Sequence, residues 1–140
     1  MPLSNSPVTS VTSPDITCNV NPTPATETVE VAAGRTIGFK LDNTLYHPGP
    51  AAIYLGKAPS TAASWDGSGA NWFKIAEWGA TFNPFSFTDE NASQLTTTIP
   101  ANTPAGEVSL QKVFLDAREH HERSEFFFST LSVLNKSHYM

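Results

Sequence analysis

The sequence is poor in cysteine, and Cys18 is the only one among its 140 residues. One cysteine cannot form a disulfide within its own chain, so a fold held together by several disulfides is excluded. No histidine stands beside Cys18 in a motif that would activate its thiol, so we do not expect this residue to be a catalytic nucleophile. An ordinary buried cysteine is one interpretation of it.

Basic residues and long apolar runs are also scarce. Lysine and arginine number 8 against 13 acidic residues, and no basic stripe is present, so nucleic acid is not an expected partner. No apolar stretch approaches the length of a membrane span, so a membrane is not an expected partner either. The first residues, Met1–Ser4, lack the basic start and apolar middle of a secretory signal peptide. The sequence as written is therefore expected to show no export signal, and its length predicts one domain.

Alternating apolar and polar residues predict β-strands over most of the chain. Thr26–Val31 and Thr36–Leu41 both alternate with period two around a glycine turn, which predicts a hairpin with Ile37, Phe39 and Leu41 on one face. Further strands are expected at Ala51–Leu55, Trp72–Trp78 and Leu95–Ile99, with turns at Asp66–Gly69 and Asn83–Pro84. Short strands between Gly and Pro turns predict an all-β sandwich of antiparallel sheets.

The composition of the chain changes after Glu107. All 11 prolines and all 8 glycines lie at or before Gly106, and three of the 4 histidines come later. We hypothesise that residues 108–140 are a non-homologous tail that translates a retained intron, because Val108-Ser109 can be encoded by a splice-donor sequence. The alternative is a helical extension, since Lys112–Arg123 contains no helix breaker. Phe126–Leu134 is instead expected to be an exposed, β-prone stretch.

A motif around His47 carries the strongest functional signal. His47 stands between a tyrosine and the run Pro48-Gly49-Pro50, directly before an apolar strand. This places a titratable, metal-capable imidazole at the end of a sheet on a rigid turn. Taken alone, a single histidine beside a strand is more often structural than a ligand, because metal sites need several converging donors.

Three further segments accompany this motif in a fixed order: Asn5–Asn19, Trp65–Gly79 and Thr97–Glu107. Together they resemble the fungal lytic polysaccharide monooxygenases of auxiliary activity family nine, formerly glycoside hydrolase family sixty-one. The resemblance covers residues 5–107. It implies an immunoglobulin-like antiparallel β-sandwich in a secreted, extracellular enzyme.

The resemblance also implies a chemistry. Members of the family hold one copper ion between an N-terminal histidine and a second histidine, which His47 matches. They cleave β-1,4-glucan such as cellulose at C1 or C4, using O2 or H2O2 and an electron donor, either a small reductant or a cellobiose dehydrogenase-like protein. Tyr46 is the expected substrate-binding residue beside the metal. Cys18 matches a cysteine whose disulfide partner in the family lies near the C-terminus, in the region that diverges here.

The sequence departs from the family at both ends. The resemblance begins at Asn5, without the N-terminal histidine, and the axial tyrosine and its neighbours would fall after Glu107. We therefore expect an incomplete sandwich with weak or no copper binding and no activity. The alternative is a non-catalytic carbohydrate-binding or structural fragment.

Other polar and aromatic residues receive weaker expectations. Asn91 begins the sequon Asn-Ala-Ser, which predicts a surface glycosylation site if the chain is exported. At least two of the tryptophans are expected to be structural. Four carboxylates, which are not expected to form a glycosidase pair, are interpreted as solvated loop or strand-end residues: Asp66, Glu77, Asp89 and Glu90.

Overall fold

The structure is a computed structural model, and it describes residues 8, 10, 12–17, 19–21, 27–115 and 117, together with the backbone of residues 127–134. Its strands are β1 (Thr28–Ala32), β2 (Thr36–Lys40), β3 (Ala51–Lys57), β4 (Trp72–Trp78), β5 (Ala80–Phe82), β6 (Phe85–Phe87), β7 (Gln94–Thr98), β8 (Gly106–Phe114) and β9 (Phe127–Leu134). Two short 3₁₀ helices cover Pro14–Ile16 and Ala62–Ser64. Among the described residues, no helix is long and apolar enough to cross a membrane.

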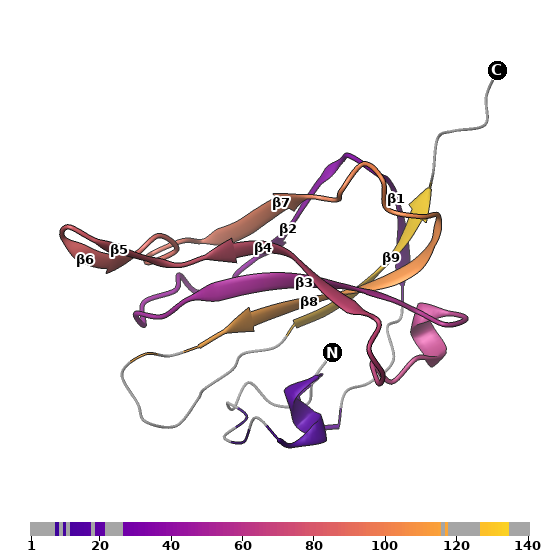
Figure 1. Cartoon of the computed structure of the whole chain (residues 1–140), viewed down its shortest axis with the longest axis horizontal. Coiled ribbons are helices and arrows are strands. Elements are labelled where there is room, and N and C mark those ends of the chain that lie inside the picture. Colours follow the sequence, from indigo (N-terminus) through magenta and orange to yellow (C-terminus); the bar gives the residue numbers. More distant parts are fainter. Residues whose placement is uncertain are drawn as a thin grey trace.

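The strands form a large sheet, a smaller sheet and a projecting hairpin (Figure 1). The large sheet has five strands in the order β1-β9-β8-β3-β4, the smaller sheet pairs β2 with β7, and β5 pairs with β6. Every pairing is antiparallel except that of β1 with β9, which is parallel. The predicted all-β sandwich is confirmed, with one parallel pair that was not expected.

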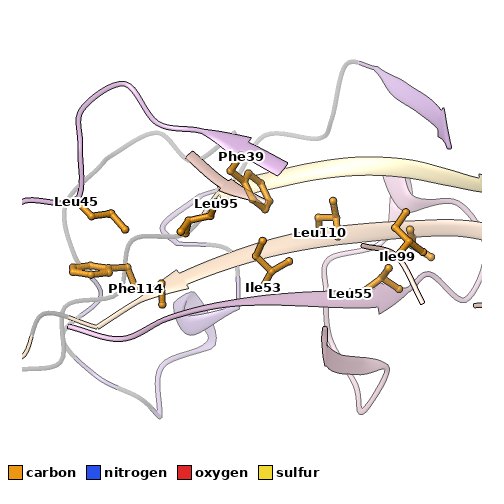
Figure 2. Close-up of a cluster of buried hydrophobic side chains, with 10 residues drawn as sticks. Phe39, Leu45, Ile53, Leu55, Leu95, Ile99, Leu110 and Phe114 are labelled. Carbon is orange, nitrogen blue, oxygen red and sulfur yellow. The ribbon is translucent and has the colours of Figure 1, made fainter. Parts of the chain in front are cut away.

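The core lies between the five-stranded sheet and the β2–β7 pair. Ile53, Leu55 and Leu110 come from the large sheet, and Phe39 and Leu95 come from the small one. All five are buried, and Figure 2 shows their side chains in one continuous cluster. Burial of this apolar surface between the two layers is the main stabilising term for the described part of the chain.

Several strands lie where the sequence pattern places them. β4 has the predicted bounds, and β2 buries Phe39 and half-buries Ile37 while Thr36 and Lys40 are exposed. The predicted turns at Asp66–Gly69 and Asn83–Pro84 also lie between strands. The alternation of apolar and polar residues was sufficient to predict these strands, because one side of each strand packs on the core.

The predicted hairpin of Thr26–Val31 with Thr36–Leu41 is wrong. β1 pairs with β9 and β2 pairs with β7, so consecutive strands belong to different sheets. Gly34 donates its N–H to the carbonyl oxygen of Ile99, the residue that follows β7. The turn between β1 and β2 is therefore bound to the end of β7 in the small sheet. The turn carries the chain from one layer of the sandwich to the other.

The helical alternative for Lys112–Arg123 is also wrong where the structure describes it. Lys112–Phe114 completes β8, which lies between β3 and β9 in the middle of the large sheet. Pairing on both edges and burial decide the conformation there, overriding local helix propensity. The predicted β-prone stretch does form a strand, β9, while residues 118–126 lie outside the described part.

The predicted boundary between Glu107 and Val108 falls inside β8, and residues on both sides pair with β3 or β9. The retained-intron hypothesis for residues 108–140 stays a prediction. Sequencing the transcript across these two codons tests it: a message spliced at this junction would support it, and one continuous exon would contradict it.

Candidate functional site

His47 lies in the segment between β2 and β3, four residues before Ala51 begins β3. Its side chain is half-buried, and its Nδ1 atom is shielded from solvent. β3 is a central strand whose Ala51, Ile53 and Leu55 are buried in the core. The imidazole is therefore presented from the segment that leads into a strand paired on both of its edges.

The segment that follows His47 is bound to the end of β8. Ala117 donates its backbone N–H to the carbonyl oxygen of Pro48 at 2.8 Å, and Leu115 donates to that of Pro50 at 3.0 Å. Gly49 between them is buried against the backbone of Leu115. The two prolines limit backbone freedom, and the two hydrogen bonds hold this turn on the sheet.

The segment that precedes His47 is bound on its other side. Leu45 donates its N–H to the carbonyl oxygen of Ala92 at 3.0 Å and accepts one from the N–H of Asn91 at 2.8 Å. Its side chain is buried, and Figure 2 shows it at the same end of the core as Phe114. His47 thus stands between two anchored stretches of backbone, which preorganises the position of its ring.

Tyr46 and His47 form an aromatic pair on the surface. Their ring centroids lie 4.1 Å apart with an interplanar angle of 48°. Tyr46 is 66% exposed, so the prediction that it is a surface residue is confirmed. Its role in substrate binding stays a prediction.

Asp89 lies in the same turn as Asn91, whose N–H binds Leu45, and the expectation that Asp89 is solvated is wrong. Its relative exposure is 1%, and neither carboxylate oxygen has a hydrogen-bond partner among the residues that the structure describes. Burial, and to a smaller extent the nearby charge of Glu90, raises the pKa of Asp89 above its ordinary value. The carboxyl group is held in an environment that favours its neutral form.

The described donor atoms do not complete a metal site. Among the described residues, no group of three or more His, Cys, Asp or Glu side chains is arranged to hold a metal ion. His120, His121, His138 and Cys18 all lie outside those residues, so the expectations for Cys18 are not tested. His47 contributes one imidazole, and a single imidazole does not by itself fit tight copper binding.

A second aromatic cluster lies at the other end of β3, about 20 Å away along the strand. Trp65 and Trp72 stack with centroids 5.0 Å apart, and their indole N–H groups donate to the carbonyl oxygens of Ser68 and Gly67. Gly56 lies against both rings, because a Cβ there would approach Trp72 within 2.6 Å. The pair holds the 65–69 loop on the strand, which confirms that at least two tryptophans are structural.

Sequence reasoning missed the exposed phenylalanines of the β5–β6 hairpin. Phe82 is 81% exposed and Phe85 is 64% exposed. The available signal was a ten-residue run, 79–88, that contains three phenylalanines and no charged residue around the Asn83–Pro84 turn.

The structure is similar to that of a crystallised relative described as a cellulose-active polysaccharide monooxygenase from M. thermophila. The two superpose with a TM-score of 0.83 over 94% of this chain and 64% of that chain, at 24% sequence identity. An identity of this size shows the fold alone. The fold is therefore the β-sandwich of polysaccharide monooxygenases.

The sequence comparisons narrow this class to one family. The model of Auxiliary Activity family 9 (formerly GH61) matches residues 2–111. An AA9 family lytic polysaccharide monooxygenase H from Malbranchea cinnamomea is 41% identical over 133 residues, covering 90% of this chain. A monooxygenase E of the same family from Podospora anserina is 44% identical over 109 residues, covering 76% of it. The chain belongs to Auxiliary Activity family 9.

The chain spans 58% of the length of the Malbranchea relative and 36% of the Podospora relative. The family match reaches four residues past Glu107, to residue 111. The alignment with the Malbranchea relative covers 90% of this chain, so it also extends beyond residue 111.

Proposed function

We propose that this chain comes from an extracellular enzyme that cleaves β-1,4-glucan such as cellulose by copper-dependent oxidation at C1 and/or C4. In this proposal His47 is one copper ligand, O2 or H2O2 is the oxidant, and a small reductant or a cellobiose dehydrogenase-like protein donates electrons. Family membership supports oxidative polysaccharide cleavage in general. The observation that carries the finer proposal is His47 at the sheet end, anchored through Leu45 on one side and Pro48 on the other.

The residues of the site have distinct roles in this proposal. Pro48 and Pro50 hold the backbone, and the shielded Nδ1 leaves Nε2 of His47 to face the metal. Tyr46 presents an exposed ring beside it, suited to the apolar face of a sugar. The described residues place no acid and base carboxylate pair at His47, and oxidative cleavage needs none.

We propose further that the 140-residue chain by itself binds copper weakly and does not turn over. The reason is the donor set, since His47 is one imidazole and the described residues supply no metal-binding cluster around it. The alternative is a carbohydrate-binding or structural module without activity, which the exposed Tyr46 favours.

Copper titration by calorimetry and by electron paramagnetic resonance tests both proposals. Weak binding that is abolished in His47→Ala and retained in His138→Ala, which changes a histidine outside the described residues, would support His47 as a ligand. Equal binding in both variants would contradict it. Oxidised sugars released from cellulose with ascorbate would contradict the proposed inactivity, whereas cellulose binding without products would favour the alternative.

A further inference from the structure

The β5–β6 hairpin carries three phenylalanines on one face. Phe82 and Phe85 are cross-strand partners, and Phe87 is two residues from Phe85, so all three point to the same side. The rings of Phe82 and Phe85 lie 6.0 Å apart, and those of Phe85 and Phe87 lie 5.5 Å apart in an edge-on arrangement. We call Phe82, Phe85 and Phe87 the aromatic row.

Exposure rises along the row toward the tip of the hairpin. Phe87 is half-buried, Phe85 is 64% exposed and Phe82 is 81% exposed. Single exposed apolar residues are common on protein surfaces, but adjacent exposed phenylalanine rings indicate a surface that a partner covers. The rings are tilted or edge-on to one another, and the large exposed fractions of Phe82 and Phe85 leave ring surface that a ligand can contact.

The hairpin that carries the row is internally hydrogen-bonded. Thr88 donates its N–H to the carbonyl oxygen of Gly79 at 3.0 Å, which closes the base. On the face opposite the row, the hydroxyl groups of Thr81 and Ser86 lie 2.9 Å apart. A support of this kind reduces the entropy lost when a ligand binds the rings.

The row and His47 lie at the same end of the sandwich. Trp78, the last residue of β4, is the cross-strand partner of Ala51, the first residue of β3. The hairpin begins two residues after Trp78, and His47 lies four residues before Ala51. Figure 1 shows the hairpin extending outward at the end where β3 begins.

We propose that the aromatic row is a docking surface for a β-glucan chain, extending the substrate contact away from His47. Pyranose rings of a β-1,4-glucan present apolar C–H faces that suit aromatic rings, and the polymer is neutral, as is the whole of segment 79–88. This inference rests on the proposed function, because it names a substrate contact of the same site.

A pull-down on insoluble cellulose tests the docking surface with the double variant Phe82→Ser/Phe85→Ser. We expect apparent affinity to fall by about tenfold or more, because both exposed rings are lost. The conservative variant Phe82→Trp/Phe85→Trp should retain binding. Phe73→Ser is the matched control, since Phe73 is 42% exposed on β4 and lies outside the hairpin.

Two results would overturn the docking surface. One is equal binding of the wild type and the double variant, or no binding by either. The other is concentration-dependent self-association in sedimentation velocity that the double variant loses while cellulose binding is unchanged, which would assign the row to a contact between copies of the chain. Copper titration of the same variants keeps the two proposals distinguishable, because loss of the row should leave metal binding unchanged.

Discussion

Gly49 and Leu115 are in such close backbone contact that no side chain fits between them. A Cβ atom on Gly49 would lie 1.7 Å from the carbonyl oxygen of Leu115 and 2.8 Å from its carbonyl carbon. Gly49 lies two residues after His47, and Leu115 directly follows β8. The position of the imidazole is thus coupled to the end of β8.

Gly49→Ala is expected to destabilise the fold by about 3 kcal/mol, because the clash is with backbone atoms, which cannot rotate away as a side chain can. Chemical denaturation measures the change in the free energy of unfolding. Gly79→Ala is the matched control, since a Cβ at Gly79 meets no atom within 4 Å. Equal stability of the two variants would contradict the contact.

Gln111 is expected to hold the N-terminal segment on the large sheet. Its Nε2 group donates to the carbonyl oxygens of Ile16 at 3.1 Å and of Thr17 at 2.7 Å, and the side chain is buried. Gln111→Ala should lower the free energy of unfolding by about 1–3 kcal/mol, because the carbonyl oxygens of Ile16 and Thr17 lose their hydrogen-bond donor. Hydrogen exchange should become faster in residues 12–17.

Gln94→Ala, at an exposed position of β7, provides the comparison for this change. Unchanged exchange in residues 12–17 of the Gln111→Ala variant would mean that other contacts hold the segment.

The sequence predicted elements whose signal is local and missed those that depend on distant pairing. β4 was predicted with its bounds because alternation and flanking turns define it. The partner of β1 is β9, about a hundred residues away, and no local pattern identifies it. β8 was misread because Gln111 and Lys112 are polar residues in a strand buried on both faces.

The candidate site divides in the same way. His47 could be found from its turn motif and from the family resemblance. The contacts that anchor it could not, because Leu115 and Asn91 are distant in the chain. The burial of Asp89 was missed because aspartate in a turn is usually solvated.

Asn91 is expected to carry an N-linked glycan when the chain passes through a eukaryotic secretory pathway. Its side chain is exposed in a turn, and its backbone has φ 65°, a left-handed conformation that asparagine tolerates. Intact mass measurement before and after glycosidase treatment detects the glycan. Asn91→Gln and Ser93→Ala should both abolish the mass difference, and a difference that persists in both would assign the glycan to another site.

Asp89 is expected to make stability depend on pH in the direction opposite to that of a salt-bridged carboxylate. Its pKa is raised above the ordinary value of 3.8, so between the two values the folded state binds more protons than the unfolded state. The contribution of Asp89 to stability is therefore fully present below pH 3.8 and is lost as pH rises through the folded-state pKa.

Replacing Asp89 with asparagine removes this charge while keeping the shape of the side chain. Asp89→Asn should raise the free energy of unfolding by about 1–3 kcal/mol at neutral pH, because a buried carboxylate is costly when, as here, the described part of the chain gives it no hydrogen-bond partner. The gain should vanish in acid, where Asp89 is already neutral. Denaturant unfolding across this range measures it, and Asp42→Asn makes the same charge change at an exposed position. A loss of stability in Asp89→Asn at neutral pH would show that the carboxylate is bound by a stabilising partner.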